Sequence, residues 1–368
     1  MAGKMDALMA EINKEFKEDL LHKGIAEYDY ERIPFTSPRL NYMTFGGIPM
    51  GKLIEFYGEE HGGKTTTCLD IVANYQNMES MKADENPDYV QKTVVYADLE
   101  NTLDVVWAQK LGVDVDNMYI FNPTNQGAET IFERLLAMIE TGEIGLMIID
   151  SIGVMVSNQA LEKSVEERTY GGIAMALTNF SKKAEMLCHK YKCTIIGINQ
   201  MRADLNSQFG GMTTTGGQAW KHNVSVRLEF RMGKYIDEKG NDLTRGAENP
   251  AGNYVLVSMK KNKTCPPTRR TGFYTLNYAN GIDYLKDLVE VAIKFNLIDK
   301  SGAWYSIIDP ETGEQAEKLQ GAYRVYEYLE NVENRDLLMK IEAYIDEQIK
   351  NRDGQDLDPA RAAELAEN

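Results

Sequence analysis

The residues most clearly able to do chemistry lie between positions 58 and 65. They read GEEHGGKT, which fits Gly-x-x-x-x-Gly-Lys-[Ser/Thr], and they follow the apolar run 53–57 and open a helical pattern. In such a strand–loop–helix, backbone N–H groups cradle phosphate, the lysine neutralises it and the threonine hydroxyl can ligate Mg²⁺. The sequence therefore predicts an ATP or GTP site. Its expected contacts are Gly58, Glu59, Glu60, His61, Gly62, Gly63, Lys64, Thr65 and Thr66.

Two further apolar runs end in acids. Asp150 follows the run 146–149, where a carboxylate could hold Mg²⁺ together with Thr65. Glu100 follows the run 93–97 and could be the general base that polarises the attacking water. Taken alone, either acid could be a solvated strand end. The phosphate-binding loop upstream favours the catalytic interpretation.

The elements that would position these residues alternate between short apolar runs and helical stretches. The expected strands are 53–57, 93–97, 118–121, 146–149 and 194–198. The expected helices between them are 65–78, 103–111, 128–140 and 173–191. This alternation is typical of a parallel sheet covered by helices on both faces, with ligands at the carboxyl ends of the strands.

Beyond residue 223 the pattern changes. Strand-like segments at 224–230, 254–259 and 272–276 predict an antiparallel edge on the sheet. Helical patterns follow at 282–298, 316–329 and 336–350. At the other end of the chain, residues 6–21 show apolar positions at three- and four-residue spacing and predict an amphipathic helix. That helix could pack on its own domain or on a neighbouring subunit.

Composition limits the possible classes of function. The 368 residues carry a net charge of −16, and the segment from Asp283 onward has 20 acids and 10 bases. A negative field repels phosphate, so any nucleic-acid site has to be local. No apolar run approaches the roughly 18 residues that span a bilayer. The four cysteines form no Cys-x-x-Cys pair. We therefore expect a cytoplasmic protein with reduced thiols, no signal peptide and no membrane span.

Six motifs, in this order and spacing, resemble the RecA-type recombinases. They are DLENTLD (98–104), KLGVD (110–114), INQMR (198–202), TTTGG (213–217), KKNK (260–263) and GAWYS (302–306). The resemblance implies an α/β fold: a RecA-like P-loop ATPase core with a mostly parallel central sheet, an N-terminal helix and a small α+β C-terminal domain. The implied parts are an N-terminal oligomerisation helix and linker, a core with DNA-binding loops, the C-terminal domain and an acidic flexible tail, over residues 1–34, 35–281, 282–350 and 351–368.

The resemblance implies ATP and Mg²⁺ as cofactors and assigns roles at the nucleotide. Glu100 would be the water-activating base beside Lys64. Gln200 would sense the γ-phosphate and pass its state to the loop that follows. The implied magnesium ligands are Thr65 and Asp150. The implied adenine contacts are Asp104, Trp107 and Tyr278, of which Tyr278 matches a residue that approaches the adenine of a neighbouring subunit.

The resemblance also implies a catalytic contribution between subunits. Lys261 and Lys263 match a pair that reaches into the ATP site of the next subunit, and Lys221 and His222 lie on the matching interface helix. Residues at i and i+2 of a strand share one face, so both cations could stabilise the charge of a transferring phosphate. Without the resemblance, the same lysines would be an exposed basic edge.

Two DNA-binding loops are implied, near 161–172 and 202–217. The second is rich in Gly, Thr and Ser, and its only aromatic residue, Phe209, could stack between bases. In the first, Gly171 replaces the family's usual Met, and Tyr170 could take over stacking. For Arg168 and Lys183, a solvated charge is an equally good interpretation. The implied DNA contacts are Arg168, Tyr170, Gly171, Gly172, Lys183, Arg202, Phe209, Thr214, Thr215, Gly216 and Gly217.

These features predict a DNA-dependent ATPase that forms helical filaments on single-stranded DNA and pairs it with homologous duplex DNA. Single-strand-binding and mediator proteins are its expected partners, in a bacterium or a phage-infected cell. The alternatives on the same core are a hexameric helicase and a regulatory ATPase. The early start of the core and the GAWYS segment behind it disfavour a helicase. A scaffold with a vestigial nucleotide site is disfavoured because Lys64, Thr65, Glu100 and Asp150 are all present.

Overall fold

We describe the protein from a computed structural model that defines residues 4–16, 21, 30–163, 172–203, 212–244 and 246–366. The chain divides into two units, Met1–Glu31 and Arg32–Asn368. The first contains helix α1 (Lys4–Phe16), which lies in the segment expected to be helical and exposes Met5, Leu8 and Phe16. Among all the residues so defined, no helix is long and apolar enough to cross a membrane.

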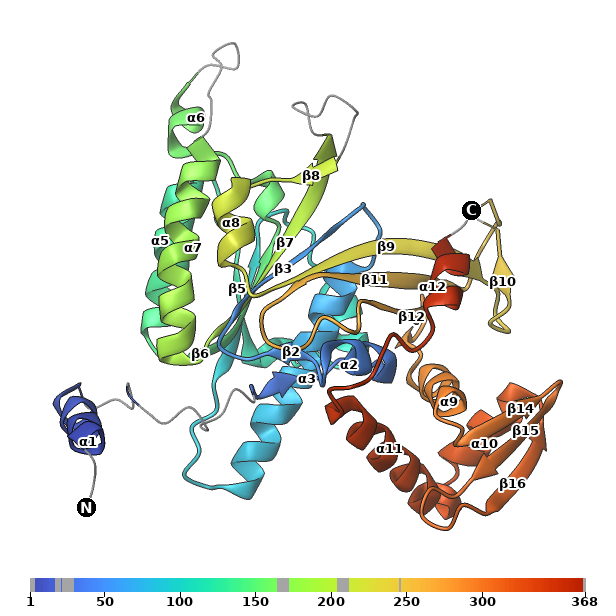
Figure 1. The fold of residues 1–368 in the computed structure, drawn as a ribbon. Helices are drawn as coiled ribbons and strands as arrows, with labels where there is room; N and C mark the ends of the chain where they lie inside the picture. Colours follow the sequence, from blue (N-terminus) through green and yellow to red (C-terminus); the bar gives the residue numbers. More distant parts are fainter. Residues whose placement is uncertain are drawn as a thin grey trace. The chain divides into compact units, whose positions relative to one another are not determined.

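The second unit is built around a mixed sheet of 11 strands (Figure 1). Its path is β13–β12–β11–β9–β3–β7–β6–β4–β5, and β10 and β8 pair with β9 and β7. The strands from β9 to β5 are parallel, whereas β9, β11, β12 and β13 run antiparallel, which confirms the expected change of pattern. The bounds are β3 (Leu53–Gly58), β4 (Thr93–Asp98), β5 (Met118–Phe121), β6 (Ile144–Asp150), β7 (Thr194–Ala203), β8 (Met212–Thr214), β9 (Val226–Ile236), β10 (Asp242–Leu243), β11 (Gly252–Asn262), β12 (Thr271–Asn277) and β13 (Gly281–Ile282).

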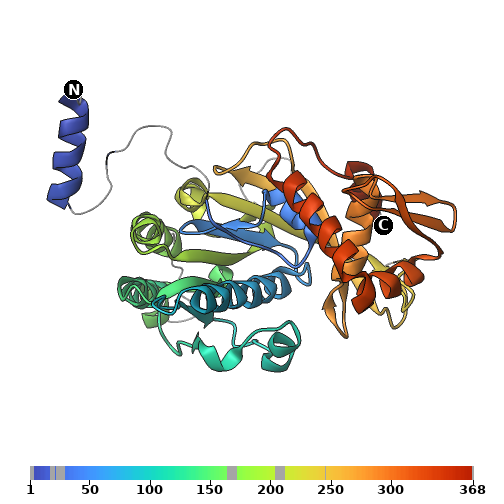
Figure 2. The same cartoon turned by 90° about the horizontal axis from the view of Figure 1, so that it is seen from below.

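The parallel strands feed two cores, because successive residues of a strand face opposite sides of the sheet. Ile148 packs in one core with residues of α3, and Ile149 packs in the other with residues of α5 and α7. Figure 2 shows α5 and α7 side by side, as two of the helices that cover this part of the sheet. The helix bounds are α3 (Lys64–Glu85), α4 (Val105–Lys110), α5 (Ala128–Glu140), α6 (Asn158–Glu162), α7 (Gly172–Tyr191) and α8 (Gly217–Asn223).

The C-terminal domain differs from the expectation in one segment. Residues 316–329 were expected to be helical, but β16 (Gln315–Gln320) occupies the first part and α10 (Ala322–Glu330) begins only after Gly321. Pairing with β15 overrides the helical propensity of QAEKLQ, as sheet context often does. The sheet β14–β15–β16 packs in one apolar cluster with the helices α9, α10 and α11. The remaining bounds are α9 (Tyr284–Lys294), β14 (Ile298–Ser301), β15 (Trp304–Ile308) and α11 (Arg335–Lys350).

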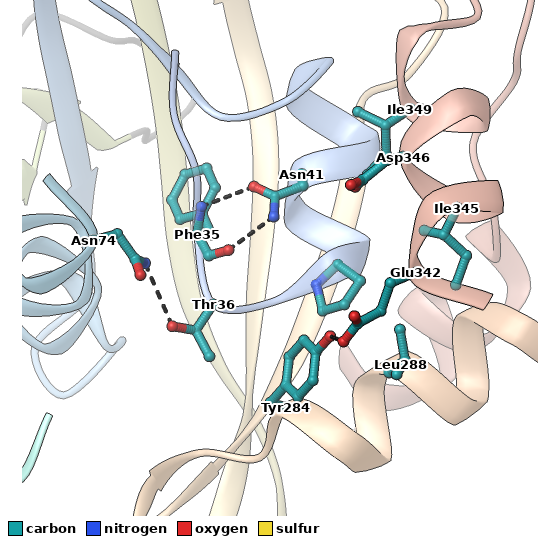
Figure 3. Close-up of a pocket in the computed structure, with 11 residues that line it drawn as sticks. Phe35, Thr36, Asn41, Asn74, Tyr284, Leu288, Glu342, Ile345, Asp346 and Ile349 are labelled. Carbon is teal, nitrogen blue, oxygen red and sulfur yellow. Dashed lines mark hydrogen bonds between the residues drawn. The ribbon is translucent and has the colours of Figure 1, made fainter. Parts of the chain in front are cut away.

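A short helix, α2 (Pro38–Thr44), joins this domain to the core. Ser37 caps its first turn, and the strands β1 (Arg32–Ile33) and β2 (Ile48–Pro49) pair beside it. Asn41 bonds both backbone groups of Phe35, at 2.8 Å each. Phe35, Pro38 and Asn41 line one wall of a groove of about 400 Å³, and residues of α9 and α11 line the other wall (Figure 3). The groove is therefore a seam between the two domains.

A buried arginine connects the two sides of this junction through hydrogen bonds. Arg269 is 1% exposed, and its guanidinium lies 3.7 Å from the ring centre of Tyr42. It donates to the carbonyls of Tyr42 and Ile349 at 2.8 and 3.0 Å, and also to those of Gln348 and Asn351. The last carbonyls of a helix lack partners within it. Arg269 therefore satisfies the end of α11 and ties it to α2.

Part of the segment 351–368, which was expected to be a flexible tail, forms a helix. Residues Pro359–Ala366 form α12, and Leu365 is 1% exposed in a cluster with Ile236, Tyr254 and Phe273. Arg361 forms hydrogen bonds of 2.9 Å to both carboxylate oxygens of Asp242. The polar composition suggested solvation, but Leu365, Ala362 and the Arg361–Asp242 pair hold the helix against β9, β11 and β12.

We predict that Arg269→Met lowers the free energy of unfolding by about 3 kcal/mol, because several buried carbonyls lose their donor. The measurement is the shift of the urea unfolding midpoint. The matched control is Arg270→Met, since Arg270 is exposed. A control variant as destabilised as Arg269→Met would show that the junction contact is unimportant.

Candidate active site

The residues of the predicted ATP site lie close together at the carboxyl ends of four parallel strands, β3, β7, β6 and β4. In the sheet register, Gly58 of β3 lies opposite Gln200 of β7, and Asp98 of β4 lies opposite Asp150 of β6. Asp98 accepts the N–H groups of Thr102 and Leu103 at 3.1 and 3.0 Å, so it holds the turn that carries Glu100. The residues of the expected site are therefore brought to the carboxyl edge of the sheet.

The phosphate-binding loop requires its glycines for steric reasons. A Cβ on Gly58 would lie 2.0 Å from the Phe230 carbonyl oxygen. Gly63 has φ 86°, in the left-handed region, and a Cβ there would lie 2.8 Å from a methyl group of Val255. Glycine adopts this backbone without strain. The neighbouring strands thus leave room for backbone alone, which keeps the N–H groups accessible to phosphate.

Lys64 is the cation of this loop and the first residue of α3. It is 8% exposed, and its Nζ donates to the carbonyl oxygens of Gly58, at 3.2 Å, and of Glu59. Burial lowers the pKa of Lys64, while the nearby Asp150 and Glu100 oppose that shift. An anion in the loop would meet both this ammonium group and the N-terminus of a 22-residue helix.

Thr65 and Asp150 form a pair of oxygen ligands suited to Mg²⁺. Thr65 Oγ1 donates to Asp150 Oδ2 at 2.9 Å, and the Tyr96 hydroxyl donates to the same oxygen at 2.8 Å. Burial raises the pKa of Asp150, and both hydrogen bonds oppose that shift. Nowhere in the described ranges do three His, Cys, Asp or Glu side chains gather as a metal site. Mg²⁺ in nucleotide sites commonly uses one or two protein ligands plus phosphates, so the pair fits it.

Glu100 and Gln200, which the resemblance gave separate roles at the nucleotide, lie together in the structure. Gln200 Nε2 lies 3.3 Å from Glu100 Oε1, and the Ser151 hydroxyl donates to the same carboxylate oxygen. Ser151 is 1% exposed and was not identified from the sequence. Its position directly after Asp150 was the only available signal. With these two donors on one oxygen, the carboxylate is held in place, as a general base requires.

The nucleoside side of the site is a cavity of about 690 Å³ beside the phosphate-binding loop. Trp107 and Tyr278 line this cavity, so Tyr278 also lies beside the phosphate-binding loop of its own chain. Asp104 instead caps α4 by accepting the Trp107 N–H at 3.0 Å. Four residues that no sequence motif predicted line the same pocket from the antiparallel strands: Met232, Tyr235, Asn253 and Leu276. From the loop, the lining residues are His61, Gly62, Gly63, Lys64, Thr65 and Thr66.

Several implied DNA contacts can be placed. Arg202 lies on β7 and donates to the Gly153 carbonyl at 2.6 Å. Gly172 begins α7, and Lys183 is exposed eleven residues further on, about 16 Å along the helix axis. Arg168, Tyr170, Gly171 and Phe209 lie outside the described residues. The residues implied as DNA contacts at the end of the second loop are Thr214 on β8 and Thr215, Gly216 and Gly217 at the start of α8.

A buried polar network anchors that end of the loop. Asn199 Nδ2 donates to Glu55 Oε1 at 2.9 Å and to the Thr215 carbonyl at 2.8 Å. Arg227 pairs with the other oxygen of Glu55 and also reaches Thr214 Oγ1 at 3.4 Å. Glu55 and Asn199 are both fully buried. Asn199 precedes Gln200, so the loop end and the Gln200 side chain are held by consecutive residues of one strand.

The implied interface lysines gather at the end of α8. Lys261 Nζ donates to the carbonyls of Lys221 and His222 at 2.6 and 2.8 Å, and Lys263 Nζ donates to His222 at 2.9 Å. Lys221 Nζ in turn donates to Thr213 Oγ1 at 2.8 Å. Burial, with Lys263 nearby, lowers the pKa of Lys261 to about 8. Neither Lys261 nor Lys263 lines the nucleotide cavity of its own chain.

Comparison with known proteins identifies the family of the chain. The chain matches the RecA N-terminal domain over residues 3–283 and the RecA C-terminal domain over residues 286–350. It is 32% identical to Protein RecA of Bordetella avium, over 99% of this chain and 94% of that protein. It is 31% identical to Protein RecA of Leptospira biflexa, over 92% of this chain and 81% of that protein. Protein RecA of Fusobacterium nucleatum is 32% identical, over 93% and 83%.

The matches cover both domains, including the C-terminal domain that a hexameric helicase or a regulatory ATPase would not require. The chain therefore belongs to the RecA family of DNA-dependent ATPases and DNA recombinases.

Proposed function

We propose that the protein assembles as a helical filament on single-stranded DNA, hydrolyses MgATP there, and pairs the bound strand with homologous duplex DNA. The observation that supports this most is the course of β7. The strand carries Gln200 beside Glu100, continues to Arg202, and pairs with β8 through Met201 and Thr214. One strand thus connects the hydrolytic carboxylate to both ends of the implied DNA loop.

We further propose that Gln200 reports the nucleotide state to this loop. Its backbone N–H donates to Asn199 Oδ1 at 3.0 Å, and Asn199 also holds the Thr215 carbonyl. Glu55 and Arg227 fix this arrangement from β3 and β9. Because the network is buried, a change at Gln200 would be carried by packed groups with discrete positions.

Lys261 and Lys263 would act on the ATP of the next subunit. Their ammonium groups lie against the C-terminal carbonyls of α8, away from their own nucleotide cavity. An interface that places them near a neighbour's γ-phosphate would supply two cations to the transition state. Because the pKa of Lys261 is about 8, its positive charge decreases as the pH rises through that value.

The central test is electron microscopy of the protein with single-stranded DNA and ATP. We expect open helical filaments; closed hexameric rings would contradict the proposal.

Glu100→Gln should form the same filaments with ATP but reduce turnover by about 100-fold or more, because the base is lost while the charged phosphate contacts remain. Turnover by this variant close to that of the wild type would remove Glu100 from the catalytic role.

For the coupling, we predict that Gln200→Ala binds ATP normally but loses most of the stimulation of hydrolysis by single-stranded DNA. Coupling between two sites commonly amounts to about 5- to 150-fold, which sets the expected loss. The measurement is ATP turnover with and without DNA. Gln315→Ala, at an exposed position of β16, is the matched control. Full DNA stimulation in Gln200→Ala would remove Gln200 from this role.

For the interface, we predict that two inactive variants complement each other. Lys64→Ala subunits retain the trans lysines, and Lys261→Ala/Lys263→Ala subunits retain the nucleotide site. Mixed filaments then contain some complete interfaces, so ATP turnover should rise above that of either variant alone. If the two variants co-assemble on DNA but remain inactive at every mixing ratio, the lysines do not act in trans.

A further inference from the structure

We infer that Tyr96 is a positioning residue for the magnesium site, because its buried hydroxyl holds the Asp150 carboxylate in the orientation needed beside Thr65. This inference rests on the proposed role of Thr65 and Asp150 as Mg²⁺ ligands. Neither the sequence motifs nor the family resemblance pointed to Tyr96, which lies inside the apolar run of β4.

The sheet register brings the phenol to the carboxylate. Tyr96 lies opposite Ile148, and Asp98 lies opposite Asp150. Tyr96 is therefore two residues before the acidic pair along β4. Residues two apart on a strand face the same side. Tyr96 and Ile148 therefore point with Asp98 and Asp150 toward α3, and the Tyr96 hydroxyl reaches Asp150 Oδ2 at 2.8 Å.

The hydroxyl, and not the ring, is the informative part of this side chain. The ring is 1% exposed and packs in the apolar core with Ile148 and Cys68, where a phenylalanine would fill the same space. Burying a hydroxyl costs free energy unless it forms a hydrogen bond. The side-chain partner of the Tyr96 hydroxyl is Asp150. The Tyr96 hydroxyl therefore serves to orient the Asp150 carboxylate.

Asp150 benefits from a donor other than Thr65. The terminal torsion of an aspartate has a broad distribution, so a single hydrogen bond leaves the carboxylate free to turn. Thr65 Oγ1 donates to Oδ2 at 2.9 Å, but its hydroxyl is itself an expected ligand of the cation. Tyr96 holds the same oxygen from within the core. Partners of this kind orient metal ligands, and their loss typically lowers metal affinity about 10- to 100-fold.

The test is a Mg²⁺ titration of the binding of a fluorescent, slowly hydrolysed ATP analogue by the full-length protein. Tyr96→Phe should need about tenfold more Mg²⁺ for half-maximal binding than the wild type. Its binding of the analogue in EDTA should be unchanged, because the phosphate-binding loop is intact. Mn²⁺ bound with the analogue, measured by electron paramagnetic resonance, should show the same weakening directly.

Tyr274→Phe is the matched control. The Tyr274 hydroxyl is also buried beside α3 but lies 2.8 Å from Thr67 Oγ1, and the control should leave the Mg²⁺ requirement unchanged. The inference is overturned if Tyr96→Phe titrates like the wild type, or if both variants shift equally. Wild-type binding that is the same with Mg²⁺ and with EDTA would instead contradict the proposed magnesium site itself.

Discussion

The parallel register of β3, β7, β6 and β4 is the constraint on which the rest of the structure depends. Hydrogen bonds between neighbouring strands set Gly58 level with Gln200, and Asp98 level with Asp150. A slip of one residue would turn each of these side chains to the opposite face of the sheet. The two apolar cores prevent such a slip, because alternate residues of each strand are buried on different sides. Catalytic geometry is therefore a consequence of hydrophobic packing.

Glu55 shows how a charged group is paired inside this packed structure. Glu55 is fully buried, yet both of its oxygens are used, one by Asn199 and one by Arg227. An unpaired buried charge would cost several kcal/mol, roughly the size of a large mutational effect. Such networks hold single arrangements, so the polar groups beside the active site also connect it to neighbouring segments. Arg269 is another buried charged group with partners. At the domain junction it donates to backbone carbonyls rather than to a carboxylate.

The sequence was informative where chemistry is local. The strand–loop–helix around Gly58–Thr65 and the bounds of β5 and α5 follow from glycine placement and apolar period. It was less informative where partners come from distant segments. Ser151 and Tyr96 gain their roles only through the register of β4 and β6, and Asn253 enters the nucleotide cavity from an antiparallel strand. The strand β16 and the seating of α12 likewise depend on neighbours that single-segment patterns do not contain.

The walls of the nucleotide cavity are of two kinds. The phosphate end is shaped by backbone, because a side chain on Gly58 would collide with the Phe230 carbonyl. The base end is shaped by exchangeable side chains, among them Trp107, Tyr278 and Asn253. Substitutions at the base end can thus change which nucleobase fits the cavity while the backbone of the phosphate-binding loop stays unchanged.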